Sequence, residues 1–249
     1  MNILEVEGLC KTYPAFRLRD VSFAVAPGTI MGFIGRNGAG KSTTIKAMLN
    51  IVHPDSGRVT MFGQDFYANE PACKQQLGVV LGGVDFYPNK KLRSITNVTR
   101  TFYDCWDENK YRHYLQLFAL DETKKVSQLS SGMRVKYMLA LALSHDARLL
   151  ILDEPTSGLD PVSRDELMEL FRSVVKSGKR SILFSTHITS DLEKCASHIT
   201  MIKDGQILCS DTRDGFLARY RAQFGDGQMS LEDILVRVER RSYDSEDFL

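Results

Sequence analysis

Four residues in one short segment have the types and spacing of a loop that binds phosphate groups. Residues Gly35, Gly40, Lys41 and Ser42 give G-x-x-x-x-G-K-S, after an apolar run and before a helix-like segment. The glycines allow several backbone N–H groups to point at phosphates, and the helix adds the positive end of its dipole. We expect Lys41 to neutralise charge between the β and γ phosphates and Ser42 to bind Mg²⁺. A plain glycine-rich turn is the alternative, which the lysine and the hydroxyl disfavour.

A second candidate for chemistry is the pair of carboxylates at the end of the apolar run RLLILDEP. Burying Asp153 and Glu154 is costly unless a cation or a proton accepts their charge. Asp153 suits an outer-shell or water-mediated contact to Mg²⁺, and Glu154 suits polarising the water that attacks a γ-phosphate. Alone, this stretch would be a solvated turn before Pro155. Together with the phosphate loop, it favours phosphoryl chemistry.

Two ring side chains are weaker candidates. His187 ends the apolar run SILFSTH, and parallel strands end at one shared edge where ligands collect, so we expect His187 near the γ-phosphate. A lone histidine at a strand end is otherwise an ordinary surface or core residue. Tyr13 could stack on a purine base, and an exposed strand tyrosine is an equally ordinary reading.

The segment QLSSGMRVK raises the possibility of a second anion site. Ser130, Ser131 and Gly132 precede the helical run RVKYMLALAL, so they present a hydroxyl and backbone N–H groups at a positive helix end. Simple N-capping by serine is the alternative and requires no ligand. The chain already has one phosphate loop. We therefore expect this second site to close on the nucleotide of another copy, with two ATP molecules buried across a two-fold axis.

The elements that must position these residues belong to an α/β fold. Strand-like runs such as GTIMGFIG, RVTMFG, QLGVVLG, RLLILDEP, RSILFSTH and HITMIKDGQIL alternate with helical periodicity, which predicts a mostly parallel sheet wrapped by helices. The first 30 or so residues alternate apolar and polar positions and predict an antiparallel N-terminal layer. Residues 84–145 predict an inserted helical subdomain. Residues 213–249 form a short tail with one capped amphipathic helix at SLEDILVRVERR.

Composition narrows the function classes. The chain has 249 residues, enough for one large domain with a subdomain, and its 32 Lys and Arg against 31 Asp and Glu give a net charge of +1. Global charge therefore does not favour nucleic acid or an anionic membrane as the main partner. The five cysteines lack CxxC spacing and are expected to be reduced, mostly buried thiols. Neither a signal peptide nor a membrane-spanning stretch is evident, so we expect a cytoplasmic protein.

In order, Tyr13 and the segments GRNGAGKST, LSSGM, LLILDEP, SGLD and STH resemble the ATP-binding subunit of ABC transporters over about residues 2–212. The resemblance implies a RecA-like P-loop NTPase core, with ATP and Mg²⁺ as cofactors. It makes Gly35–Thr43 the Walker A loop, Ser130–Met133 the signature motif that faces the partner's γ-phosphate, and Ser157–Asp160 the D-loop at the dimer seam. The residues implied to bind ATP are Tyr13, Gly35, Asn37, Gly38, Ala39, Gly40, Lys41, Ser42, Thr43, Ser130, Ser131, Gly132 and Asp160.

The same resemblance implies the catalytic roles and shows two departures. Asp153 is the Walker B aspartate, which shares the metal with Ser42, Glu154 is the catalytic base, and His187 is the switch histidine. The signature reads LSSGM where the family usually has LSGGQ, so Ser131 and Met133 replace a glycine and a glutamine. The Q-loop glutamine is also missing, since Gly82 stands in its place, and we expect Asp85 or a water to fill the gap.

Several segments look like the bacterial subgroup whose ATPase pairs with a separate permease, including exporters of phenol-soluble-modulin-type peptides. We therefore expect export of peptides or other amphipathic compounds. The expected partners are a permease, which would hold the protein at the inner face of the cell membrane, and a second ATP-binding subunit, identical or a close paralogue. Aromatic residues of the helical insertion are candidates to grip a permease helix or to fill the subdomain core: Phe86, Tyr87, Phe102, Tyr103 and Trp106.

Two other function classes stay open. A soluble ATPase of the same fold could scaffold a non-transport assembly, such as one for iron–sulfur cluster delivery, with the same ATP site. A regulator that binds nucleotide without hydrolysing it is disfavoured by Glu154 and His187, which have roles only in hydrolysis.

Overall fold

The computed structural model describes residues 1–81 and 87–240. Its N-terminal layer is an antiparallel sheet with strand order β2-β1-β4-β5. The strands span Leu4–Tyr13 (β1), Phe16–Val25 (β2), Ser56–Met61 (β4) and Gln64–Asp65 (β5). Strands β1 and β2 form a long hairpin whose alternating burial matches one covered face and one solvated face.

The second sheet has strand order β10-β9-β3-β8-β7-β6, and only its edge strand β10 is antiparallel. The strands span Ile30–Ile34 (β3), Leu77–Val80 (β6), Leu149–Asp153 (β7), Ser181–Thr186 (β8), His198–Lys203 (β9) and Gln206–Thr212 (β10). Strands β3, β7 and β8 are buried throughout, as expected for parallel strands covered on both faces. Their carboxyl ends meet at one edge of the sheet.

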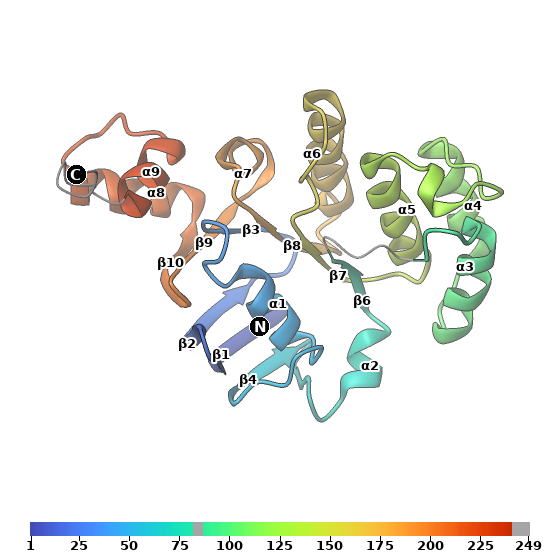
Figure 1. Ribbon diagram of the computed structural model, residues 1–249, viewed down its shortest axis with the longest axis horizontal. Helices are drawn as coiled ribbons and strands as arrows, with labels where there is room; N and C mark the ends of the chain where they lie inside the picture. The colour runs from blue at the N-terminus through green and yellow to red at the C-terminus, as the bar shows by residue number, and fades with distance from the viewer. Residues whose placement is uncertain (82–86, 241–249) are drawn as a thin grey trace.

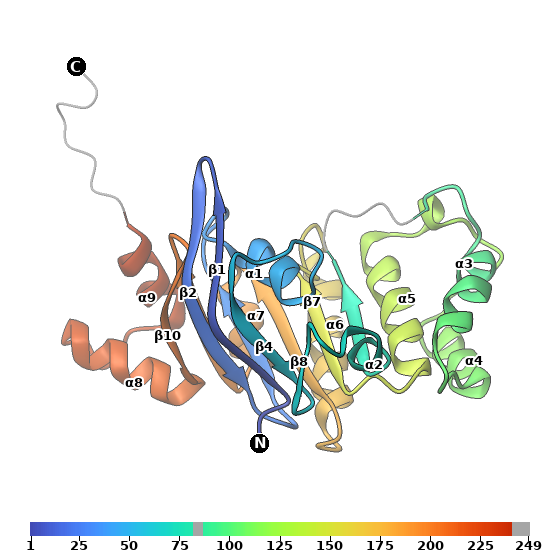
Figure 2. The ribbon, with the colours of Figure 1, turned by 90° about the horizontal axis from the view of Figure 1, so that it is seen from below.

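Helices cover both faces of the parallel sheet (Figure 1). Helix α1 (Lys41–Met48) lies between the two sheets, where its Ile45 and Met48 join the apolar core (Figure 2). Helices α6 (Pro161–Val175) and α7 (Thr189–Cys195) pack on the opposite face. The short helix α2 (Glu70–Lys74) leads into β6.

The helical subdomain lies at one side of the sheets (Figure 1). It comprises α3 (Leu92–Thr99), η1 (Arg100–Phe102), α4 (Glu108–Leu117), η2 (Val126–Gln128) and α5 (Ser131–Ser144). It has its own apolar core, at whose centre the Thr96 hydroxyl bonds the buried hydroxyls of Tyr111 and Tyr137 at 2.8 and 2.9 Å. The shared hydroxyl satisfies both tyrosines, so the core can bury them.

The C-terminal segment packs on the far side of the molecule from the helical subdomain (Figure 2). Helix α8 (Arg213–Phe224) and helix α9 (Leu231–Glu239) bury Phe216 and Ile234 in the core that also holds α6 and α7. Ser230 caps α9 through a capping box with Asp233, as the sequence predicts. Helices α8 and α9 are thus part of the packed molecule.

The α/β fold, the antiparallel layer and the helical insertion are confirmed, and two smaller predictions are wrong. The run RVTMFG is strand β4 of the antiparallel layer, because it pairs with β1 rather than with the parallel strands. The cysteines are free, yet only Cys73 and Cys209 are buried, and Cys105 is exposed on the helical subdomain. Among the described helices, none is both long and apolar enough to cross a bilayer.

Candidate functional site

The phosphate loop connects β3 to α1. Gly40 caps α1 with a φ of 114°, a conformation that residues with a Cβ rarely adopt. At Gly35, a Cβ would lie 2.3 Å from the Ile202 carbonyl oxygen, so only glycine fits there. Lys41 is 5% exposed, and its Nζ donates to the Gly35 carbonyl at 2.7 Å. The lysine side chain therefore folds back onto the phosphate loop, whose tight backbone turn depends on the glycines.

Three side chains from separate elements meet at this loop. Lys41 Nζ lies 3.1 Å from Glu154 Oε1, and His187 Nδ1 lies 2.9 Å from Glu154 Oε2. Glu154 directly follows β7 and His187 directly follows β8, so the parallel strand ends bring the two residues together. The structure thus joins the lysine, the carboxylate and the histidine into one chain of polar contacts.

A serine that the sequence analysis missed holds the end of β7. Ser185 Oγ donates to Asp153 Oδ1 at 2.6 Å and accepts from the Glu154 backbone N–H at 2.9 Å. Asp153 is 4% exposed and is the last residue of β7, directly before Glu154. A serine hydroxyl and a carboxylate oxygen are the oxygen ligands that Mg²⁺ takes in proteins, so Ser42 and Asp153 fit the metal.

A second missed residue is Asp191, a buried carboxylate on α7 with no exposed surface. Its Oδ2 accepts from Thr156 Oγ1 at 2.7 Å and from Thr186 Oγ1 at 3.5 Å. Thr156 lies two positions after Glu154, and Thr186 directly precedes His187. Burial raises the pKa of Asp191 above its usual value, and the hydrogen bond from Thr156 opposes this. Asp191 therefore connects the turn that carries Glu154 to the turn that carries His187.

Tyr13 lies beside the phosphate loop. A hollow of about 390 Å³ is lined by the tip of the β1–β2 hairpin, Gly38 of the loop and Asp204 of the β9–β10 turn. Tyr13 lines it and is 38% exposed. A ring at this place could stack on a base whose phosphates occupy the loop.

Ser130, in the segment that resembles the signature motif, caps helix α5. Within the described residues, Ser130 Oγ accepts from the Met133 backbone N–H at 3.2 Å, and no hydrogen bond or ion pair joins Ser130–Met133 to Gly35–Thr43. Asp160 caps α6 by accepting from the N–H groups of Val162 and Ser163. The capping role is thus present, and a ligand for this helix end would come from elsewhere.

Comparison with known proteins decides the family. A family model described as ABC transporter matches residues 18–157, more than half of the chain. The chain is an ABC transporter ATP-binding subunit. It is 33% identical to the bacitracin transport ATP-binding protein BcrA of Bacillus licheniformis, over 99% of this chain and 81% of that protein.

Further relatives agree with this assignment. The subunit is 36% identical to Nod factor export ATP-binding protein I of Burkholderia pseudomallei (strain 1710b), over 75% of this chain and 62% of that protein. A solved structure described as the ATP-binding subunit of an ABC transporter has a TM-score of 0.83 and 29% identity, and the match covers 96% of this chain and 100% of that one. The fold and the ATPase class of the subunit are therefore established.

The aromatic residues of the ATP-binding subunit's helical insertion divide into two groups. Tyr103 stacks on His145 with ring centroids 3.6 Å apart, and Trp106 packs against the subdomain core. Tyr87 and Phe102 are 62% and 68% exposed. Phe86 lies outside the described residues, as do Gly82 and Asp85, which concern the missing Q-loop glutamine.

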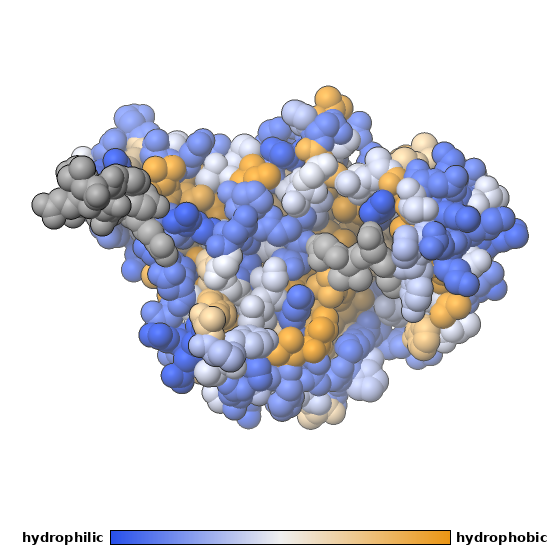
Figure 3. Space-filling view, viewed as in Figure 1, coloured by the Kyte–Doolittle hydropathy of each residue, from blue (hydrophilic) through white to orange (hydrophobic). Residues whose placement is uncertain are grey.

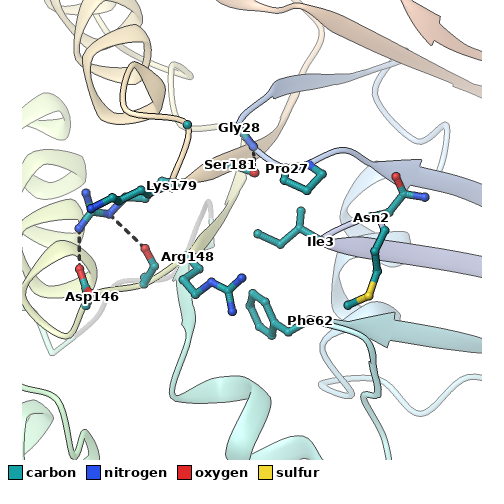
Figure 4. Close-up of a pocket in the computed structure, with 13 residues that line it drawn as sticks. Asn2, Ile3, Pro27, Gly28, Phe62, Asp146, Arg148, Lys179 and Ser181 are labelled. Atoms are coloured by element: carbon teal, nitrogen blue, oxygen red, sulfur yellow. Dashed lines mark hydrogen bonds and ion pairs between the residues drawn. The ribbon is translucent and has the colours of Figure 1, made fainter.

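A separate hollow of about 400 Å³ lies at the opposite edge of the parallel sheet, where β7 and β8 begin (Figure 4). Arg180 donates to Asp146 at 2.7 Å, and the Arg148 guanidinium lies 5.3 Å from the centre of the Phe62 ring. Glu154 and His187 follow the other ends of these strands, so this hollow is distinct from the phosphate loop.

Proposed function

We propose that this subunit encloses ATP and Mg²⁺ between two ATP-binding subunits and uses hydrolysis to drive export through a membrane permease. The observation that carries the proposal is the contact chain from Lys41 through Glu154 to His187, with nitrogen-to-oxygen distances of 3.1 and 2.9 Å. These contacts place a lysine that can bind phosphate, a carboxylate that can act as a base, and an imidazole at one edge of the sheet.

The chemistry follows from the positions of these groups. Lys41 is freed from Glu154 when phosphates enter the loop, and its charge then stabilises the charge that develops on the γ-phosphate. Glu154 accepts a hydrogen bond from the attacking water, and His187 contacts the γ-phosphate and holds the Glu154 carboxylate in place. Bound Mg²⁺ would be held by Ser42 and Asp153 and would neutralise phosphate charge. Positioning and electrostatics account for the whole reaction.

A second subunit completes the site in this proposal. Signature residues Ser130 and Gly132 of one subunit approach the γ-phosphate bound to the Walker A loop of the other, with Tyr13 stacked on the adenine and Asp160 at the dimer seam. A Cβ at Gly132 would meet its nearest atoms at 3.6–3.8 Å, which is ordinary contact. The subunit's own packing therefore does not require glycine at this position, and we expect any effect of a side chain there to act on the bound γ-phosphate.

The face that carries the phosphate loop is suited to such a partner. Figure 3 shows hydrophilic residues along the rim of this face and hydrophobic residues in the hollow between the antiparallel layer and the helical subdomain. A cassette of the same fold, with a TM-score of 0.73 and 19% identity, was solved as a dimer bound to ADP and Pi. That likeness concerns the fold, and it supports the geometry of a dimer.

The permease and its cargo extend the proposal. The relatives described for bacitracin transport and Nod factor export favour an exporter of peptides or other amphipathic compounds. Exposed Tyr87 and Phe102 are the described aromatics that could contact a permease helix. The permease would hold the subunit at the inner face of the membrane, and the narrower resemblance to phenol-soluble-modulin exporters stays a prediction.

The test of hydrolysis and dimerisation uses Glu154→Gln. We expect this variant to bind ATP, to lose at least about a hundredfold in kcat, and to form an ATP-dependent dimer on a sizing column, because a general base contributes about that much. Wild-type protein with ADP serves as the monomeric control. Unchanged turnover in Glu154→Gln would contradict the assigned base.

Membrane coupling needs its own experiment, since a soluble scaffold ATPase would have the same ATP site. We expect the native protein to sediment with membranes and to be released with its permease by detergent. Alanine at both Tyr87 and Phe102 should weaken that association without lowering basal ATPase activity. Recovery of the native protein only in the soluble fraction would favour the scaffold class.

A further inference from the structure

The last turn of helix α9 is bonded to the nucleotide-binding edge of the molecule. Lys203 Nζ donates to the Val238 carbonyl at 2.7 Å, and Arg36 Nη1 donates to the Glu239 carbonyl at 3.4 Å. These carbonyls end a helix, where the dipole favours cations. Arg36 is a residue of the Walker A loop, and Lys203 ends strand β9. The C-terminal helix therefore reaches the phosphate loop through two cationic side chains.

The β9–β10 turn is itself in contact with the phosphate loop. The Gly205 backbone N–H donates to the Ala39 carbonyl at 2.9 Å, two positions after Lys203. The carbonyl oxygen of Ile202, the residue before Lys203 on β9, lies only 2.3 Å from the position that a Cβ of Gly35 would occupy. Lys203 thus sits between two residues that touch the loop. Its bond to α9 holds the strand end that supports the phosphate loop.

Helix α9 is anchored independently of these bonds. Leu231 and Ile234 are buried in the main core, and Arg237 lies with its guanidinium 4.7 Å from the centre of the Phe224 ring. Glu239 is half-buried, and its Oε1 has no hydrogen-bond partner among the described residues. Burial raises the pKa of Glu239, which the charges of Lys203 and Arg36 oppose. Helix α9 is therefore held in place by its own packing, and its C-terminal end brings together the charged side chains of Lys203, Arg36 and Glu239.

We propose that α9 positions the phosphate loop through Lys203 and Arg36, so that docking of this helix and binding of nucleotide favour each other. The proposal rests on the proposed ATP site at Gly35–Thr43. Reciprocity follows from thermodynamic linkage: if the docked helix raises nucleotide affinity, bound nucleotide must stabilise the docked helix by the same factor. Lys203 and Arg36 are positioning residues here, because the hydrogen bonds that their side chains donate are to α9.

The first experiment measures ADP binding by titration calorimetry, since ADP occupies the phosphate loop without requiring a dimer. We expect Lys203→Met to weaken ADP affinity about fivefold, the lower end of common coupling factors, and Lys203→Arg to restore it by donating to the same carbonyl. Arg237→Met, on the same helix but facing Phe224, is the matched control and should bind like wild type. Wild-type affinity in Lys203→Met would overturn the proposal.

The second experiment tests the reciprocal effect in the wild-type full chain by amide hydrogen exchange. We expect saturating ADP to slow exchange in residues 231–240, and Lys203→Met to remove that slowing at saturation. Equal exchange of α9 with and without ADP would overturn the proposal and assign any effect of Lys203 to direct contact with nucleotide. Absence of ADP binding by the wild type would instead contradict the ATP site itself.

Discussion

The backbone of Glu154 has an unusual conformation, which sets the direction of its carboxylate. Its φ of 50° lies in a region that residues other than glycine rarely adopt. The Ser185 hydroxyl fixes the Glu154 N–H at 2.9 Å, and the following turn is held through Thr156 by buried Asp191. Strain of this kind persists only where surrounding bonds over-determine the conformation. At the residue scale, the position of the proposed base Glu154 therefore depends on Ser185, Thr156 and Asp191.

Thr156 offers the sharpest test of this support. Thr156→Val keeps the side-chain shape but removes the donor to Asp191, leaving a buried carboxylate oxygen with a weaker set of bonds. We expect kcat to fall about tenfold, because small misplacement of catalytic groups is costly, with KM for ATP within about twofold. Steady-state ATPase assays measure kcat and KM, and thermal unfolding measures the stability of the variant.

Thr156→Ser is the control, since it keeps the hydroxyl and should restore most of kcat. A purely structural role would lower the unfolding temperature of Thr156→Val and leave the kcat of its folded fraction unchanged. That result would remove Asp191 from the positioning of Glu154 and His187.

At the scale of elements, the helical subdomain joins the core through a buried histidine. His145 directly follows α5, stacks on Tyr103, and bonds the Gln75 carbonyl through Nδ1 at 3.2 Å. Gln75 also clamps the subdomain, donating to the Phe102 carbonyl at 2.7 Å and accepting from the Asp104 N–H at 3.1 Å. This junction sets where α5, and with it the signature motif, lies relative to the sheets.

The junction predicts a pH dependence of stability. Burial lowers the pKa of His145 from 6.5 to about 4. Between pH 6.5 and pH 4, His145 binds a proton in the unfolded chain more readily than in the folded protein. Its contribution to the free energy of unfolding is therefore fully present above pH 6.5 and is lost as the pH falls towards 4. We expect about 2 kcal/mol of the acid destabilisation at pH 5 to come from this residue. Urea unfolding at pH 7.5 and pH 5 measures it.

His145→Phe keeps a ring against Tyr103 and cannot titrate. The variant loses the bond to Gln75 and is expected to be less stable at pH 7.5, with a smaller decrease between pH 7.5 and pH 5 than wild type. The same decrease in both proteins would show that His145 is not the titrating group.

At the scale of the whole molecule, no hydrogen bond or ion pair among residues 1–81 and 87–240 joins the phosphate loop to Ser130–Met133 of the same chain. Gly132→Ala separates folding from assembly, because its Cβ has ordinary space in the subunit. We expect an unchanged unfolding temperature and unchanged ADP affinity, with ATPase activity reduced at least about tenfold by the methyl group at the partner's γ-phosphate. Specific activity of the wild type should also rise with protein concentration.

Full activity of Gly132→Ala, or a wild-type rate per subunit that is independent of dilution, would contradict a site shared between two subunits. The unfolding temperature and the ADP affinity of Gly132→Ala are the controls, because local damage to α5 would change the unfolding temperature.

The sequence by itself determined the phosphate loop, the carboxylates after β7, the histidine after β8 and the capped helix α5. Each depends on a few adjacent residues whose backbone geometry is local: glycines for a tight turn, a lysine and hydroxyl at fixed offsets, an apolar run ending in charge. The parallel strand pattern then placed Glu154 and His187 at one edge, because parallel strands end together.

Only the tertiary structure decided that β4 joins the antiparallel layer, that Asp191 bonds the turns after β7 and β8, and that α9 reaches the phosphate loop. Arg36 and Glu239 are 203 positions apart, and Thr156 and Asp191 are 35 apart. Contacts of this kind depend on strand order and on which helix face is buried against which sheet. No local pattern of residue types encodes them, because the same polar side chains on a surface would simply be solvated.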